Sequence, residues 1–316
     1  MNKVVLILVD GMRPDGMMAC GHPEVEYLRT NGRTTLEART VMPSVTLPCH
    51  MSMIHSVDPE RHGVSTNTFT PMVRPITGLF EQLRKLEKKN AFFYSWGELK
   101  DLYKPSSLAD CRFMSGQQHD WAKITDQLTD AAAAYLQSDT PDFLFLYLGE
   151  TDEVGHKYGW MSEEYLATVS NAVSCIQRVY ENLPEGYTLI VTADHGGHER
   201  RHGENIPEDM SIPVTFLAAY VFHLPFPVVY ALMLISEDYI KTWLCIRYFR
   251  SWRWLMPVTQ EGRENALALR PMTDMDDVLR AQQETTAAVD MLLSRGTPSL
   301  SGVHPVAASL QRADMG

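Results

Sequence analysis

The chain has 316 residues and a formal net charge of −11 at pH 7. This length is enough to bury the core of one large domain, and the negative charge argues against a general nucleic-acid-binding protein, although metal ions would still allow an anionic substrate to bind. The five cysteines are scattered and form no CxxC motif, which indicates reduced thiols in a cytoplasmic protein.

The first predicted element is the apolar run at residues 4–9, VVLILV. Its β-branched and leucine content is typical of a strand buried on both faces of a parallel sheet. The run is too short for a signal peptide, ends at Asp10 and has no small-residue cleavage site, so we expect a cytoplasmic location.

Strands and helices then alternate along the chain. Residues 34–41 form a weaker strand candidate, and residues 43–50 predict a turn that leads into a helix. Ser162 is expected to cap a helix that runs to about Asn182. The other predicted strands are 91–95, 143–148 and 187–193, and the other predicted helices are 76–89 and 119–137. This order predicts an α/β fold with a mainly parallel central sheet flanked by helices.

Three of the predicted strands end in acidic motifs. They are VDG at Asp10, GETDEVGH at Asp152 and His156, and TADHGGH at Asp194 and His195. Because the carboxyl ends of parallel strands meet at one edge of a sheet, we expect these groups to converge there. Carboxylates and neutral imidazoles suit divalent metal ions, so the pattern predicts a metal site; each motif alone is also compatible with a solvated polar turn.

A nucleophile is expected at the same edge, and Thr46 is the candidate. It stands where a turn enters a helix, so both a metal ion and the helix N-terminus would favour its alkoxide. The alternative is that Thr46 serves only as a helix cap.

The segment from residue 43 to residue 67 reads PSVTLPCHMSMIHSVDPERHGVSTN. It resembles the nucleophile segment of the nucleotide pyrophosphatase/phosphodiesterase family, within the alkaline phosphatase superfamily. The shared pattern is a threonine followed by x-P-x-H and then by P-E-x-H-G-(x)3-N. The resemblance covers roughly residues 1–216 and implies an alkaline-phosphatase-like fold.

The resemblance also implies a set of site residues. Two divalent metal ions, zinc by preference, would be bound, and Asn67 would help to hold the phosphoryl oxygens. The last metal ligand is assigned to His202, because a His-Gly pair before a proline-flanked strand is similar to the final ligand of the superfamily; His198 is the alternative. One ion would be held by Asp10, Thr46, Asp194 and His195, and the other by Asp152, His156 and His202. The remaining histidines, at positions 22, 50, 55, 62 and 223, are interpreted as structural or surface groups.

The function implied is hydrolysis of phosphodiester or nucleotide pyrophosphate bonds through a phospho-threonine intermediate. The substrate would be a small-molecule phosphate ester or a nucleotide, and no nucleic-acid binding is expected. A phosphomonoesterase, a phosphonate hydrolase or a sulfatase could use the same scaffold. An inactive, membrane-associated protein is the alternative from another class.

The C-terminal third does not continue the resemblance. We expect a catalytic domain over residues 1–216, an atypical apolar and aromatic segment over 217–296, and a disordered tail over 297–316. Residues 211–236 contain no Asp, Glu, Lys or Arg. This uncharged stretch is long enough for a membrane span. Three prolines and the basic residues that follow disfavour such a span. Two other interpretations of this segment are possible. It could be a buried or hairpin insertion, or it could be foreign to the fold because the reading frame has slipped.

Overall fold

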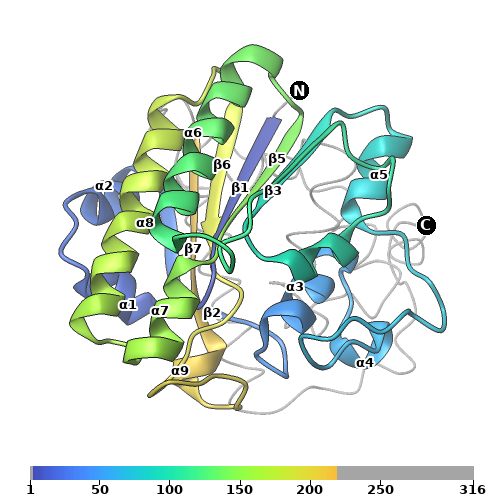
Figure 1. Cartoon of the computed structure of the whole chain (residues 1–316). Coiled ribbons are helices and arrows are strands. Elements are labelled where there is room, and N and C mark those ends of the chain that lie inside the picture. Colours follow the sequence, from blue (N-terminus) through green and yellow to red (C-terminus); the bar gives the residue numbers. More distant parts are fainter. Residues whose placement is uncertain (1–2, 219–316) are drawn as a thin grey trace, which may run out of the picture. The chain divides into compact units, whose positions relative to one another are not determined.

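The computed structural model describes residues 3–218, which all belong to one compact unit. In this part of the chain a single sheet runs through the centre, in the order β2-β7-β6-β1-β5-β3-β4 (Figure 1). All of its pairings are parallel except those of β7, which runs antiparallel to both β2 and β6. The strands are β1 (Lys3–Val9), β2 (Arg33–Arg39), β3 (Asn90–Tyr94), β4 (Asp110–Phe113), β5 (Phe143–Leu148), β6 (Tyr187–Thr192) and β7 (Ser211–Ala218).

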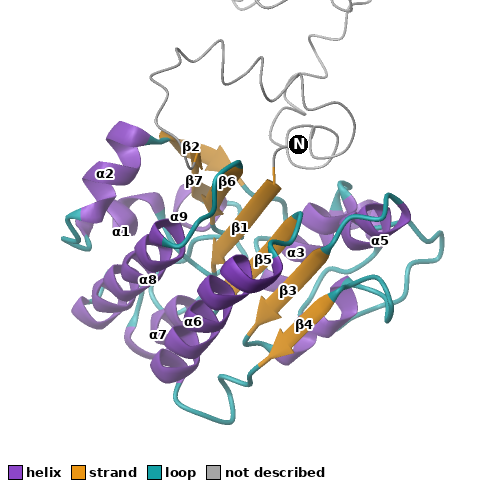
Figure 2. Cartoon of the chain, turned by 90° about the horizontal axis from the view of Figure 1, so that it is seen from above, coloured by secondary structure: helices purple, strands orange, loops and turns teal. Residues whose placement is uncertain are grey.

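Helices cover both faces of this sheet (Figure 2). On one face lie α1 (Pro14–Ala19), α2 (Glu24–Asn31), α6 (Trp121–Asp139), α7 (Glu150–Tyr158) and α8 (Glu163–Glu181). On the other face lie α3 (Thr46–His55), α4 (Pro59–His62), α5 (Leu79–Lys85) and the 3-10 helix η1 (Gly97–Leu102), while α9 (Pro207–Met210) directly precedes β7. The predicted α/β fold with a mainly parallel, helix-flanked sheet is confirmed.

Strand β1 shows how the sequence builds the two cores. Val5, Ile7 and Val9 pack into the core beneath α6 and α8, and their neighbours Val4, Leu6 and Leu8 pack into the core beneath α3 and α5. Successive side chains of a strand point to opposite faces, so a strand that is covered on both sides must be apolar throughout. The continuous run VVLILV therefore requires the central position that β1 occupies between β6 and β5.

Several predicted elements have the expected bounds. Strand β5 matches the prediction, and the Ser162 side chain caps α8 by accepting a hydrogen bond from the backbone N–H of Tyr165, 3.2 Å away. The helix predicted over residues 76–89 is shorter, because Gly78 is its N-cap and donates its N–H to the Glu81 carboxylate. Strand β4, at the edge of the sheet, was not predicted, since its four residues alternate between partly buried and exposed.

The apolar stretch of residues 211–236 begins with a strand of the sheet. Residues Ser211–Ala218 pair with β6 on one side and β2 on the other, so a membrane span that starts at residue 211 is wrong for this part. Among the described residues, no helix combines the length and the apolar character needed to cross a bilayer. The predictions for the remainder, 219–316, lie outside the described residues.

Candidate metal centre

The three acidic motifs converge at one edge of the sheet. Strand β1 lies between β6 and β5, so the chain segments that follow these three strands emerge side by side. Asp10 follows β1, Asp194 follows β6, and Asp152 lies in the first turn of α7, just after β5. The convergence that the motifs predicted is therefore confirmed.

The first cluster is formed by Asp10, Asp194, His195 and Thr46, all fully buried. The Nε2 atom of His195 lies 3.3 Å from Asp10 Oδ1, 3.4 Å from Asp194 Oδ2 and 3.1 Å from Thr46 Oγ1. Its other ring nitrogen, Nδ1, lies 2.7 Å from the carbonyl oxygen of Gly196 and must donate its hydrogen there. The Nε2 lone pair consequently faces two carboxylate oxygens and one hydroxyl oxygen.

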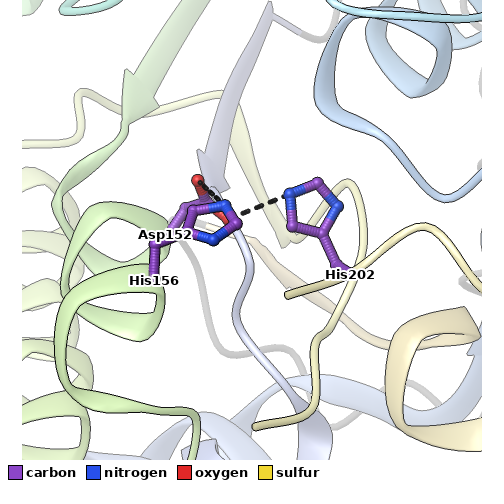
Figure 3. A group of neighbouring side chains, drawn as sticks. All are labelled: Asp152, His156 and His202. Atoms are coloured by element: carbon purple, nitrogen blue, oxygen red, sulfur yellow. Dashed lines mark ion pairs between the residues drawn. The ribbon is translucent and has the colours of Figure 1, made fainter. Parts of the chain in front are cut away.

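The second cluster is formed by Asp152, His156 and His202 (Figure 3). His156 Nε2 lies 3.4 Å from Asp152 Oδ2, and His202 Nε2 lies 3.6 Å from Asp152 Oδ1. Asp152 and His156 are one helical turn apart in α7, as their spacing predicted, whereas His202 comes from the loop between β6 and α9. This cluster is more open than the first, because 43% of the His156 side chain is exposed.

Both histidines of the second cluster are oriented in the same way as His195. His156 Nδ1 lies 2.9 Å from the carbonyl oxygen of Arg200, and His202 Nδ1 lies 2.8 Å from that of Ser44. A histidine that ligates a metal commonly donates its other ring N–H to such an acceptor, which fixes the tautomer and the ring orientation. All three imidazoles thus present a bare Nε2 to carboxylate oxygens.

The two clusters adjoin each other. The rings of His195 and His202 stack with their centroids 3.8 Å apart. The ligand groups of the two clusters therefore lie side by side in one centre.

The carboxylates of this centre lack the partners that buried carboxylates need. Asp10 Oδ1, Asp194 Oδ2 and Asp152 Oδ1 are buried and accept no hydrogen bond. Each of these atoms faces a histidine Nε2 that carries no hydrogen. Bringing lone pairs together without a proton or a cation is unfavourable in a buried site. The donor set consequently fits divalent ions at both clusters, with Asp and His as suitable ligands.

Burial and mutual repulsion change the acidity of these groups in the metal-free protein. Burial, and after it the negative charge of Asp152, raises the pKa of Asp194 to about 8. Burial and the charge of Asp194 raise the pKa of Asp10 well above its usual value. Burial lowers the pKa of the His195 imidazole well below its usual value, so this side chain stays neutral, the form that binds metal.

Thr46 is the first residue of α3, and its hydroxyl points into the first cluster. Its neighbour Leu47 donates a backbone N–H to Asn67 Oδ1, 3.0 Å away. The amide of Asn67 is thereby held beside the helix N-terminus and Thr46, where the pattern of the segment placed it. This contact fixes the orientation of the Asn67 amide by its Oδ1 atom.

His198, the alternative to His202, is occupied elsewhere. Its Nδ1 lies 2.7 Å from the buried carboxylate of Asp209, and its Nε2 accepts a hydrogen bond from Arg201 Nε at 3.0 Å. The geometry therefore brings His202, rather than His198, to Asp152 and His156, although its role as a ligand remains a prediction.

Two residues near the centre have roles that the sequence did not indicate. Tyr147, at the end of β5, donates its hydroxyl hydrogen to Asp10 Oδ2. His50 was interpreted as structural; its Nδ1 donates to the Thr46 carbonyl oxygen at 2.8 Å and lies 3.5 Å from Asp194 Oδ2. The sequence does contain one indication of the Tyr147 contact: a tyrosine in an otherwise apolar buried strand needs a hydrogen-bond partner for its hydroxyl.

The comparisons with known proteins agree with this architecture. The family model of the type I phosphodiesterase / nucleotide pyrophosphatase matches residues 4–90 and 88–208. Human ectonucleotide pyrophosphatase/phosphodiesterase family member 7 is 23% identical over 224 residues, which are 62% of this chain and 48% of that protein. A separate, short match does not bear on this architecture: Endonuclease MutS2 of Acetivibrio thermocellus is 46% identical over 55 residues, 17% of this chain and 7% of that protein.

Solved structures show the same fold. The inactive threonine-to-alanine variant of murine ectonucleotide pyrophosphatase / phosphodiesterase 5, in complex with AMP, superposes with a TM-score of 0.52 at 19% identity and covers 62% of this chain and 57% of that one. The fold is thus the alkaline-phosphatase-like α/β fold. The chain belongs to the type I phosphodiesterase / nucleotide pyrophosphatase family, and it spans about half the length of the human family member 7.

We predict that His202→Ala removes one bound zinc ion per chain and that His198→Ala does not. The reason is that His202 Nε2 faces Asp152, whereas both ring nitrogens of His198 are engaged with Asp209 and Arg201. Metal content after dialysis, measured by atomic emission, distinguishes the two variants. Loss of zinc from His198→Ala alone would reverse the assignment.

We further predict that the metal-free protein loses stability as the pH rises from about 5 to 8. The folded state keeps a proton on Asp194 up to a pKa of about 8, whereas the unfolded chain releases it near 3.9. In this window the folded state binds more protons, so the free energy of unfolding falls by up to about 1.4 kcal/mol per pH unit for one group. Urea unfolding in a chelator measures this slope.

The matched control for this measurement is Asp194→Asn, which cannot ionise and should show a shallower slope. With saturating zinc the trend should weaken or reverse, because the metal competes with protons for the carboxylates. An equally steep fall in the Asn variant would assign the proton to another group.

Proposed function

We propose that the chain is a metal-dependent hydrolase of phosphodiester or nucleotide pyrophosphate bonds that works through a phospho-threonine intermediate. The observation that carries the proposal is the position of the Thr46 hydroxyl, 3.1 Å from His195 Nε2 beside Asp10 and Asp194. Two divalent ions, with zinc suited to mixed imidazole and carboxylate ligands, would stabilise the attacking and leaving oxygens.

In the proposed reaction Thr46 Oγ1 forms a bond to phosphorus as the bond to the leaving oxygen breaks, in line with the attack. Without an ion, the Thr46 hydroxyl donates its hydrogen to His195 Nε2. An ion held by Asp10, Asp194 and His195 would take this lone pair and would favour loss of the hydroxyl proton to solvent, which makes Thr46 Oγ1 the attacking group. Thr46 is the first residue of α3, so a phosphoryl group on its oxygen would lie near the positive end of the helix dipole, which favours negative charge. Water then cleaves the phospho-threonine and restores the hydroxyl.

The catalytic domain in this proposal comprises residues 1–216, which the family match over 4–208 supports. A cytoplasmic location also remains a proposal; it is supported by the scattered positions of the five cysteines and by the lack of a CxxC motif.

We predict that Thr46→Ala lowers kcat by on the order of 10³-fold or more, because the group that attacks phosphorus is removed. Thr46→Ser keeps a hydroxyl and should retain measurable turnover. Acid quenching during turnover, followed by mass spectrometry, should find the phosphoryl group on Thr46 of the wild type. Full activity in the Ala variant would exclude Thr46 as the nucleophile.

The number of fixed cations near the centre indicates whether a phosphomonoester or a phosphodiester is the preferred substrate. A transferred monoester group carries about two negative charges near neutral pH and a diester group one, so a monoesterase benefits from an additional fixed cation. Two arginines near the nucleophile segment are engaged away from the centre: Arg39 with Asn205 at 3.3 Å, and Arg61 with the carbonyl of Arg74 at 3.0 Å. In the loop that carries His202, Arg201 contacts His198 and Glu204. Arg200, in the same loop, is the cation that would reverse the preference if it reached the centre.

We therefore predict that kcat/KM for a bis-aryl phosphate exceeds that for the matching aryl phosphate at the same pH and zinc concentration. The neutral Asn67 amide can hold a singly charged group without a second cation. A tenfold preference for the monoester, about 1.4 kcal/mol of transition-state stabilisation, would overturn the diesterase assignment. Aryl phosphonates and aryl sulfates in the same assay test the alternative esters on this scaffold.

A further inference from the structure

Trp160 lies at the junction of the two segments that carry the histidines of the second cluster. It follows α7 by two residues and is 6% exposed. Its ring meets His156 edge to face, with centroids 5.1 Å apart, and meets His202 at 5.9 Å. The indole thus contacts both imidazoles without offering an atom to a metal ion.

Two glycines make room for this indole. A Cβ atom on Gly155, in α7, would lie 2.7 Å from the ring, and one on Gly197, in the loop after β6, would overlap it. Gly155 immediately precedes His156, and Gly197 belongs to the same loop as His202. The indole consequently fills the space between the helix and the loop and sets their separation.

Hydrogen bonds join Trp160, which follows α7, to the segments after β1 and after β6. Its Nε1 donates to the carbonyl oxygen of Gly11 at 2.9 Å, and its backbone N–H donates to that of Glu199 at 2.7 Å. Gly11 adopts a φ of +65°, which favours glycine, and its own N–H donates to Asp194 Oδ1. The Gly11 carbonyl oxygen also accepts a hydrogen bond from the Tyr165 hydroxyl at 3.0 Å, so the first cluster is held independently of Trp160.

We propose that Trp160 is a positioning residue that sets the distance between His156 and His202 and thereby the affinity of the second metal ion. The proposal rests on the two-ion centre of the proposed function. It predicts an asymmetric effect: loss of the indole weakens the ion at Asp152, His156 and His202 and leaves the ion at Asp10, Asp194 and His195 unchanged.

The test is zinc titration of the metal-free full chain in competition with a chromophoric chelator. Asp152→Asn first identifies which equivalent of zinc belongs to the second cluster. In Trp160→Phe, which lacks the indole N–H and part of the ring, that equivalent should bind about tenfold to hundredfold more weakly. The first equivalent should stay within about twofold of the wild type. Circular dichroism and the melting temperature verify that the variant is folded.

The matched control is Trp121→Phe, because Trp121 also packs against two glycines, Gly116 and Gly149, whereas the ring contacts of His156 and His202 with a tryptophan are made to Trp160. Both zinc equivalents should bind to this variant as they do to the wild type. Gly197→Ala provides a second route, since the added methyl group displaces the indole while Trp160 itself is retained; it too should weaken only the second equivalent.

The outcomes separate this proposal from the proposed function. A wild-type chain that binds fewer than two zinc ions refutes the two-ion centre, whatever Trp160 does. If the wild type binds two and Trp160→Phe binds the second equally well, the positioning role is refuted. Equal weakening of both equivalents would also refute it, because the effect would then pass through Gly11 to the whole centre.

Discussion

The constraint on which this structure depends is the burial of three carboxylates at adjoining strand ends with histidines as their nearest ionic partners. Like charges in a buried site repel strongly, and here each carboxylate retains an oxygen without a hydrogen-bond donor. The metal-free protein relieves the repulsion by holding protons on Asp10 and Asp194, as their raised pKa values show. A divalent cation relieves it without a proton, so the same arrangement that weakens the metal-free fold favours metal binding.

Backbone contacts orient the histidines of the centre so that their Nε2 lone pairs face the carboxylate oxygens. Backbone carbonyls of Gly196, Arg200 and Ser44 take the Nδ1 hydrogens of the three histidines. Because main-chain acceptors do not titrate, the tautomers do not vary with pH until an imidazole itself is protonated. The ligands are therefore oriented by the secondary structure, and little side-chain freedom remains to be lost when a cation binds.

Much of this organisation could be predicted from the sequence. The run VVLILV and its end at Asp10 define a central strand and place a carboxylate at its edge, because period and burial together leave no other position for six consecutive apolar residues. The i, i+4 spacing of Asp152 and His156 likewise required only that their segment be helical. The spacing of a motif therefore predicts the structure correctly where the residues belong to one strand or one helix.

The partners of Tyr147, His50 and Trp160 could not be predicted in this way, although a tyrosine in an apolar buried strand indicates that its hydroxyl needs a partner. Tyr147 meets Asp10 across two strands that are 137 residues apart in the chain, and Trp160 meets Gly11 at a separation of 149. Such contacts depend on the order of the strands in the sheet and on the space beside glycine residues. A local sequence pattern predicts neither of these. Strand β4 was missed for a related reason, since an edge strand is half exposed and lacks the continuous apolar run of a central one.

Strand β7 has a consequence for the order in which the protein folds. It lies between β2 and β6, so the pairing of Thr34 with Thr215 joins positions 181 residues apart, and within the described residues β2 reaches the sheet only through β7. Closing so long a loop is slow compared with local pairing. During synthesis the β6-β1-β5 core can assemble as soon as β6 has emerged. The loop that carries His202 lies between β6 and β7, so we expect the second cluster to form only when both strands are in the sheet.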